Sequence, residues 1–412
     1  MNYIKTFDNG LKLVVVEMKG LLSVACGVLV KTGSANESEK ENGISHFIEH
    51  TCFKGTKTRS AFEISDFVDS IGGQINAYTS KQMTCYYTHT TKEHLNDSME
   101  ILSDIFFNSV FDKTELNKEK GVIIEEINMS EDTPEDLCLD LLSESFYGKC
   151  GLGQTILGSA KNVRSFNRDA VKKYMDKYYT ADNTVIAIAG NVSVKTAEKL
   201  AERYFAQLFT RIKSAPQIDC ETTEPKHLKK VKQIEQSHIG ICMPALSITD
   251  NRRDTLTIAN IILGGGMSSR LFQKIREDLG LCYSIYSYLS CYRDTGVLEI
   301  YAGVNTESRD TALKAIKDEI AKFKDGVTEQ EFLRGKEQLK SSLILGQESV
   351  SGQMQLFGRY ALLCGELFDF NERLKSINEI TRSDVLKVID EFFDIKKASS
   401  ATVGPKRGAL KI

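Results

Sequence analysis

The sequence predicts an α+β fold with two similar domains, each an antiparallel sheet packed against helices. Three observations lead to this fold class. The chain has 412 residues, which is more than one hydrophobic core ordinarily serves. Segments with strand-like and helix-like hydrophobic periods follow one another in the same order in both halves. Between the halves, residues 213–230 are polar and lack helical periodicity, which is typical of a linker. We therefore expect domains at residues 1–212 and 231–412.

The elements of the first half follow a short N-terminal strand, which an Asn-Gly turn introduces. We expect a strand, two helices, a hairpin, two more helices and a late strand at residues 24–30, 43–53, 61–71, 75–90, 94–108, 114–129 and 185–189. The second half repeats this order at residues 239–243, 252–263, 269–279, 285–304, 308–323, 329–345 and 400–403. The amino-acid sequences of the two halves have little identity, so we infer a duplicated unit from the shared order of elements.

Composition and charge exclude several classes of protein. The formal net charge is -3 and the pI is about 6.2, so nothing indicates nucleic acid or an anionic membrane as a partner. No apolar run is long enough to span a bilayer, and the first residues do not resemble a signal peptide. The ten cysteines form no C-x-x-C pair, which favours free thiols. We expect a cytoplasmic protein.

The strongest functional signal is the sequence His46-Phe47-Ile48-Glu49-His50. Residues four apart on a helix lie one turn above each other, so His46 and His50 can bind one ion, and Glu49 falls on the same side. A catalytic zinc has three protein ligands and a water, with a carboxylate nearby to accept the water proton. The alternative is a surface helix with two histidines by chance. The other four histidines have no partner at a metal spacing.

A third ligand must come from another element, and a carboxylate is expected. The predicted helix at 114–129 offers Glu119, Glu125 and Glu126. Glu119 and Glu126 are seven residues apart and share a helical face, whereas Glu125 points elsewhere. Spacing alone does not choose among the three.

These two segments together resemble the pitrilysin-type zinc metallopeptidases, which include insulin-degrading enzyme and the mitochondrial processing peptidase. The resemblance covers almost the whole chain and is closest to the short, two-domain branch around the processing peptidase and its bacterial homologues. It implies a clamshell-type peptidase with one zinc per chain. It also implies that Glu126 is the third ligand and that Glu119 supports the metal ligands without binding the metal itself.

The same resemblance implies where a substrate binds. The segment Asn76-Ala77-Tyr78-Thr79 matches a sheet-edge strand that an extended peptide joins through main-chain hydrogen bonds. Phe47 is a further candidate for contact with substrate, although its place in the helix pattern also allows it to anchor the helix in a core. Taken without the resemblance, the strand is an ordinary hairpin arm.

In the second half, Arg276 and Tyr283 match an arginine and tyrosine that stabilise the oxyanion in this family. Otherwise they are a charge at a helix end and an aromatic side chain in a strand. Gly264-Gly265-Gly266 precedes them and could cradle a phosphate, but it lacks the lysine and spacing of a P-loop. We interpret it as a flexible, close-packed connection.

Asp136 and Asp140 occupy positions at which the processing peptidase receives a substrate arginine. The first of these is a glutamate in that family, so Asp136 has a shorter reach. Taken by themselves, acids in this stretch suit the positive N-terminus of a helix.

The sequence therefore predicts a zinc endopeptidase for unfolded peptides or presequence-like segments. Glu49 would be the general base, with Arg276 and Tyr283 at the oxyanion. By analogy with the four-domain members of the family, we expect a homodimer in which each active site receives the Arg276–Tyr283 pair from its partner. The alternatives are a catalytically silent peptide-binding or partner subunit of the same fold and a nucleotide-dependent enzyme.

Overall fold

The computed structural model describes residues 2–149, 151–209, 224–405 and 410, and their contacts divide the chain into two compact units. Unit 1 comprises the described residues of Met1–Ile127, Thr155–Asp219 and Leu345–Phe368. Unit 2 comprises those of Asn128–Gln154, Cys220–Ile344 and Asp369–Ile412. Each unit has its own sheet and its own hydrophobic core.

Unit 1 is built on a six-stranded sheet in the order β1-β2-β6-β3-β5-β4. The strands are β1 (Asn2–Thr6), β2 (Lys12–Glu17), β3 (Ser23–Val30), β4 (Gln74–Thr79), β5 (Thr84–Thr91) and β6 (Thr184–Gly190). Neighbours run antiparallel except β2 and β6, which are parallel. This order leaves β4 as one edge of the sheet.

Both faces of this sheet are covered. The even-numbered residues of β3, from Val24 to Val30, join the main core with α1 (Ile44–Cys52), α3 (Leu95–Asn108), α4 (Lys113–Asp132) and α7 (Arg168–Tyr178). The odd-numbered ones face α12 (Val350–Cys364), where a Cβ added to Gly27 would lie 2.3 Å from the sulfur of Met354. The remaining helices of unit 1 are α2 (Ala61–Ser70), α6 (Ala160–Ser165) and α8 (Val194–Ala201).

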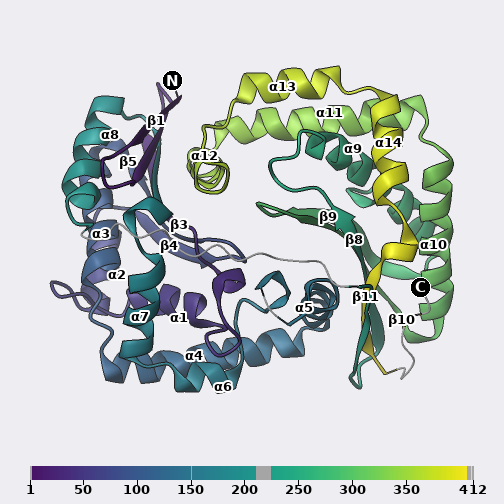
Figure 1. Cartoon of the computed structure of the whole chain (residues 1–412), viewed down its shortest axis with the longest axis horizontal. Helices are drawn as coiled ribbons and strands as arrows, with labels where there is room; N and C mark the ends of the chain where they lie inside the picture. The colour runs from purple at the N-terminus through teal and green to yellow at the C-terminus, as the bar shows by residue number, and fades with distance from the viewer. Residues whose placement is uncertain (1, 150, 210–223, 406–409, 411–412) are drawn as a thin grey trace. The chain divides into compact units, whose positions relative to one another are not determined.

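Unit 2 is built on a five-stranded sheet in the order β7-β11-β8-β10-β9. The strands are β7 (His227–Val231), β8 (Gln236–Ala245), β9 (Cys282–Cys291), β10 (Gly296–Asn305) and β11 (Ser399–Gly404). One face packs against α9 (Arg253–Gly264), α10 (Arg309–Asp325) and α14 (Arg382–Phe392), and the other against α5 (Pro134–Tyr147) (Figure 1). A Cβ added to Gly240 of β8 would lie 3.1 Å from Leu142 of α5. Helices α11 (Glu329–Leu345) and α13 (Phe370–Glu379) complete the unit.

The two sheets have the same topology, which confirms the predicted duplication. Strands β2, β6, β3, β5 and β4 correspond in order to β7, β11, β8, β10 and β9, and β1 is an addition. The equivalent pairs β2–β6 and β7–β11 are parallel, and the other equivalent pairs are antiparallel. The predicted α+β class is therefore correct.

The units differ from the contiguous domains expected at residues 1–212 and 231–412. Helix α5 follows the first set of elements yet packs on the second sheet, and α12 follows the second set yet packs on the first. Each helix buries its apolar side on the sheet face that the unit's other helices leave uncovered. Of the expected linker, residues 213–223 lie outside the described part, and residues 227–230 belong to β7. Its lysines suit the edge position of this strand.

Candidate metal centre

A buried carboxylate holds the start of α1. Gly43 takes the N-cap position with φ 99°, a left-handed conformation that favours glycine. Glu37, which is 3% exposed, accepts hydrogen bonds from the backbone N–H of Gly43 at 2.7 Å and of Ser45 at 2.8 Å. The Asn42 side chain donates a third bond at 3.0 Å. Burial raises the pKa of Glu37 to about 7, partly opposed by these hydrogen bonds. The first turn of the helix is thereby fixed to the preceding loop.

Helix α1 divides into an apolar side and a side with both histidines. Ile44, Phe47 and Ile48 are essentially fully buried in the unit 1 core. On the other side the rings of His46 and His50 are neighbours, with centroids 4.5 Å apart. The helical spacing predicted from the sequence therefore brings the two imidazoles together.

Glu126 of α4 meets both histidines. Its Oε2 lies 3.5 Å from Nε2 of His46 and 3.6 Å from Nε2 of His50. The potential ligand atoms of the three residues all lie within 4.8 Å of one another. Although the Glu126 side chain is 42% exposed, Oε2 itself is buried and receives no hydrogen bond from a described residue. A buried carboxylate oxygen facing two imidazole nitrogens fits a divalent metal such as zinc.

The protonation state of His46 also fits a ligand role. Burial, with a smaller contribution from His50, lowers the pKa of His46 to about 4. The ring is therefore neutral near pH 7 and forms no ion pair with Glu126. Its Nδ1 is buried without a hydrogen-bond partner among the described residues.

His50, in contrast, is oriented by a second carboxylate. Its Nδ1 lies 2.9 Å from Oε1 of Glu119, whose other oxygen lies 2.8 Å from Nζ of Lys54. Glu119 is 4% exposed, and burial opposes its charge, but the hydrogen bonds from His50 and Lys54 lower its pKa overall. A proton held on Nδ1 by Glu119 leaves Nε2 of His50 as the lone-pair donor. These contacts are compatible with the supporting role that the family resemblance implies for Glu119.

Glu49 lies on the same helix beside these ligands. Its Oε2 accepts a hydrogen bond of 2.5 Å from the hydroxyl of Thr79, the last residue of β4. Burial raises the pKa of Glu49, while the Thr79 and His50 interactions act in the opposite direction. A carboxylate with a raised pKa is a stronger base than an exposed one, which suits proton transfer.

Strand β4, which includes the candidate peptide-binding residues, is an edge strand. It pairs with β5 alone, with Asn76 opposite Tyr87 and Tyr78 opposite Cys85. Asn76 is exposed, and Ala77, Tyr78 and Thr79 are partly exposed. The expectation that Phe47 contacts substrate is not met. Phe47 is 0% exposed and packs against Phe166, at 5.5 Å between ring centroids, so its role is to anchor α1.

Arg276 and Tyr283 lie together in unit 2. Arg276 belongs to a π-helical segment, η6 (Phe272–Asp278), and its guanidinium lies 4.9 Å from the ring centre of Tyr283. Tyr283 is on the edge strand β9 and is 77% exposed. The pair forms one exposed cation–π contact. In the preceding glycine loop, Gly264 packs against Ser287, which agrees with a close-packed connection.

The acidic candidates Asp136 and Asp140 lie in the first two turns of α5, also in unit 2. Partial loss of hydration and the neighbouring Glu135 raise the pKa of Asp136, which keeps much of its surface in solvent. Glu135 accepts a hydrogen bond of 2.5 Å from the hydroxyl of Tyr286. The sequence analysis predicts a role for Asp136 and Asp140 and does not include Glu135.

Sequence reasoning also missed Glu37 and Lys54. Lys54 lies beyond the end of α1 at Cys52, so no helical spacing relates it to His50. Glu37 precedes a helix start, where an acid is favourable, but a loop separates it from the residues that it binds. A pattern search therefore has a weak signal for Glu37 and none for Lys54.

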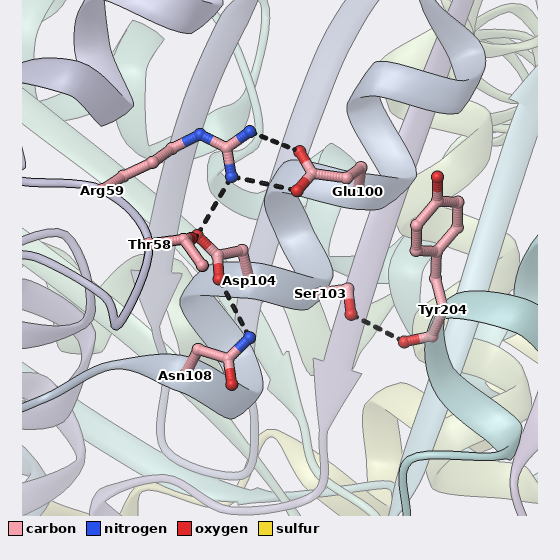
Figure 2. Close-up of a pocket in the computed structure, with 7 residues that line it drawn as sticks. All are labelled: Thr58, Arg59, Glu100, Ser103, Asp104, Asn108 and Tyr204. Atoms are coloured by element: carbon pink, nitrogen blue, oxygen red, sulfur yellow. Dashed lines mark hydrogen bonds and ion pairs between the residues drawn. The ribbon is translucent and has the colours of Figure 1, made fainter.

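A separate pocket in unit 1 has a volume of about 400 Å³ and is lined by Thr58, Arg59, Glu100, Ser103, Asp104, Asn108 and Tyr204. Figure 2 shows the Arg59 guanidinium between Glu100 and Asp104, at 2.9 Å and 3.1 Å. Ser103 donates to the backbone carbonyl of Tyr204 at 2.7 Å. The polar groups around this pocket bind one another, so the pocket is a structural junction and adds no reactive group to the site.

Comparison with known proteins shows the family of the chain. Residues 13–160 match the family model described as insulinase (peptidase family M16), and residues 165–339 match the peptidase M16 inactive domain. A Bacillus subtilis protein named "Uncharacterized zinc protease YmxG" is 42% identical over 94% of this chain and 95% of its own length. The chain belongs to peptidase family M16. His46, His50 and Glu126 lie within the first match, and the resemblance to the pitrilysin-type peptidases is confirmed.

Other M16 relatives have similar names and folds. A Rickettsia bellii protein named "Uncharacterized zinc protease" is 36% identical over 98% of this chain and 97% of its own length. The crystal structure of a protease from Helicobacter pylori has a TM-score of 0.91 at 23% identity and covers 98% of this chain and 99% of its own. A peptidase M16 inactive domain from Pseudomonas fluorescens has a TM-score of 0.90 at 20% identity, with 99% coverage of both chains. These two structures share the fold. Within the described residues, no helix has the length and apolar character needed to cross a membrane.

Proposed function

We propose that the protein is a zinc-dependent endopeptidase that cleaves unfolded peptides or presequence-like segments. The observation that supports this most strongly is the buried Oε2 of Glu126, which faces Nε2 of both His46 and His50 and has no other described partner. This donor set of two imidazoles and one carboxylate is the one used by hydrolytic zinc sites. A bound zinc supplies a Lewis acid there, which acidifies a water and polarises a carbonyl.

The protein side chains have distinct roles in this proposal. His46, His50 and Glu126 hold one zinc per chain, and Glu119 keeps the His50 ring in the required tautomer. Glu49 accepts the proton of the attacking water at its carboxylate and later donates it to the leaving amine. Arg276 and Tyr283 stabilise the oxyanion that forms on the former carbonyl.

Strand β4 would hold the peptide. Because β4 has one unpaired edge among the described strands, an extended chain can add to it through main-chain hydrogen bonds. Such binding needs little from the side chains and requires an unfolded segment. Asp136 and Asp140 would favour arginine near the scissile bond. Replacing both aspartates with asparagine tests this preference, which should fall for arginine-containing peptides and stay unchanged for matched peptides without arginine.

We also propose that the enzyme is a homodimer in which each site receives Arg276 and Tyr283 from the partner chain, by analogy with the four-domain M16 members. The test mixes a Glu49→Gln chain with an Arg276→Ala/Tyr283→Phe chain, each nearly inactive alone. Partial recovery of activity that depends on protein concentration is expected. A mixture that stays inactive although the chains exchange would show that the pair does not act in trans. The cytoplasmic location also stays a prediction.

The decisive experiment for the function is mass spectrometry of products from a library of unfolded peptides, with and without a chelator. Zinc-dependent internal cleavage is expected, and Glu49→Gln should abolish it. Peptide binding without cleavage by the zinc-loaded protein would instead identify the silent peptide-binding subunit. Nucleotide titration addresses the third alternative, for which binding is not expected.

A further inference from the structure

Thr79 occupies the point where the edge strand meets the general base. It is the last residue of β4 and pairs with Thr84, the first residue of β5. A tight turn joins the two strands, closed by a hydrogen bond of 2.8 Å from Ser80 N–H to the Met83 carbonyl. The position of the Thr79 backbone is therefore set by the hairpin and not by the metal-binding helix.

The Thr79 side chain reaches from this hairpin to α1. Its hydroxyl lies 2.5 Å from Oε2 of Glu49. An ionised carboxylate can only accept, so the hydroxyl is the donor. The backbone N–H of Thr79 also interacts with the Glu49 carboxylate, so both bonds from this residue hold it. The hydroxyl is engaged by Glu49, so any contact between Thr79 and a peptide on β4 would come from its backbone.

A glutamate needs such a partner to act as an oriented base. Fixing the long side chain of a glutamate costs rotamer entropy. A hydrogen bond to a charged group is strong enough to offset this cost. Thr79 is the hydrogen-bond donor to Glu49 in the described part of the chain.

We propose that Thr79 is a positioning residue that orients the general base Glu49 through its hydroxyl, so that the strand offered to the peptide also aims the catalytic carboxylate. This inference rests on the proposed peptidase function for its catalytic consequence. It differs from a role in substrate binding, because it assigns the side chain to the enzyme's own base.

Thr84 provides a matched comparison on the same hairpin. Its hydroxyl donates to the backbone carbonyl of Thr32 at 2.9 Å and lies at 3.5 Å, a long contact, from the Thr79 hydroxyl, and Thr84 is 0% exposed. The Thr84 hydroxyl therefore ties β5 to the loop after β3, which is a structural role. Thr79 and Thr84 face each other across the ladder, so replacing either removes one hydroxyl from nearly the same place.

The kinetic test compares three zinc-loaded variants on one unfolded peptide. Thr79→Val should lower kcat at least about tenfold with KM and zinc content unchanged, as expected for the loss of a hydrogen bond to a charged group. Thr79→Ser retains the hydroxyl and should keep kcat close to that of the wild type. Thr84→Val should leave kcat unchanged even where its thermal stability falls. Wild-type kcat in Thr79→Val, equal losses in Thr79→Val and Thr79→Ser, or a rise in KM alone would each overturn the proposal.

A second measurement does not depend on activity. Crystal structures of the metal-free wild type and Thr79→Ser should show one orientation of the Glu49 carboxylate, whereas Thr79→Val should show the side chain turned away or in several rotamers. An unchanged Glu49 in Thr79→Val would refute the positioning role. If Glu49 depends on Thr79 but the wild type cleaves no peptide, the peptidase function fails and the positioning role stands. If the wild type and Thr79→Val cleave the peptide equally, the positioning role fails and the peptidase function stands.

Discussion

Helices α1 and α9 occupy equivalent places in the two copies of the repeated unit, after the equivalent strands β3 and β8. In α9 the buried carboxylate of Asp254 is matched by Arg373, with contacts of 2.7 Å and 2.9 Å. In α1 the buried His46 is neutral and faces a carboxylate oxygen of Glu126 that has no hydrogen-bond partner among the described residues. The two helices therefore have the same position in the fold, but the buried carboxylate of α9 has a charged partner, whereas the carboxylate oxygen that faces α1 has none among the described residues.

This difference shows how function separates from fold in a duplicated chain. Both helices anchor a core through apolar residues, Ile44, Phe47 and Ile48 in α1 and Leu256, Ile258 and Leu263 in α9. Asn260 of α9 also has a buried oxygen, Oδ1, without a hydrogen-bond partner among the described residues, but it belongs to no group of potential metal ligands there. What distinguishes α1 is that Nδ1 of His46 and the facing Oε2 of Glu126 are buried and lack such partners within a group of two imidazoles and one carboxylate. Such atoms are costly unless a ligand completes them, and this is the copy that we propose to bind metal.

The largest effect should come from the general base. Glu49→Gln removes the proton acceptor and should lower kcat by about 10²–10⁴-fold, while zinc content and peptide affinity remain close to those of the wild type. Turnover assays, metal analysis and calorimetric binding of an unfolded peptide measure the three quantities. Near-normal turnover would assign the base to another residue.

The next largest effect should come from the third ligand. Glu126→Gln should weaken zinc binding by more than the about 10–100-fold loss that is typical of supporting residues. Its neighbour Glu125 is exposed and provides the control, because Glu125→Gln should retain full zinc affinity. Competition titrations with a chromogenic chelator measure both affinities. A loss in Glu125→Gln with full occupancy in Glu126→Gln would reverse the assignment.

A smaller effect on zinc affinity is expected from Glu119, the carboxylate that contacts His50. Glu119→Gln removes the charged partner of His50 and Lys54 and should lower zinc affinity by about 10–100-fold. Unlike Glu126→Gln, this variant should regain most of its activity when zinc is in excess, because the three ligands are still present. Failure to recover at saturating zinc would show that Glu119 acts on the chemistry and not only on the metal.

The smallest effect should appear in unit 2 and concern stability. The side chain of Arg270 binds Glu331 at 2.6 Å and lowers the pKa of that carboxyl to about 2. A pKa that is lower in the folded state adds stability above the unfolded value of about 4.3, and this contribution disappears as the pH falls to about 2. At pH 7 the free energy of unfolding should therefore be about 1.5 kcal/mol larger for the wild type than for Glu331→Gln. Denaturant melts should show the difference shrinking between about pH 5 and pH 2. A difference that does not change with pH would contradict the ion-pair explanation.

Much of the architecture and the metal motif could be predicted from the sequence because both depend on short-range periodicity. The spacing of His46 and His50 determines that they share a helical face. Choosing Glu126 over Glu119 required the family resemblance, since helical spacing relates those two carboxylates to each other and not to α1. The misassignment of Phe47 has a similar cause, because proximity along the chain to two ligands says nothing about which side of the helix faces substrate.

The exchange of helices could not be predicted. The hydrophobic periodicity of α5 and α12 shows that each buries one side, but not which sheet it covers. In the same way, Glu37 binds a helix start through a loop whose path is set by close packing of Gly43 on Gly158, and not by any sequence period.

The exchange of α5 and α12 has a consequence for the order of folding during synthesis. The first sheet has all its strands once β6 has been made, but its second face stays uncovered until residues 350–364 of α12 emerge. Helix α5 is made early and must wait for β8 and for β11, which ends at residue 404. Because β11 lies between β7 and β8, the second sheet closes only with the C-terminal residues. We therefore expect that unit 1 is completed before unit 2 during synthesis and that nascent chains depend on protection of these apolar faces until α12 and β11 have emerged.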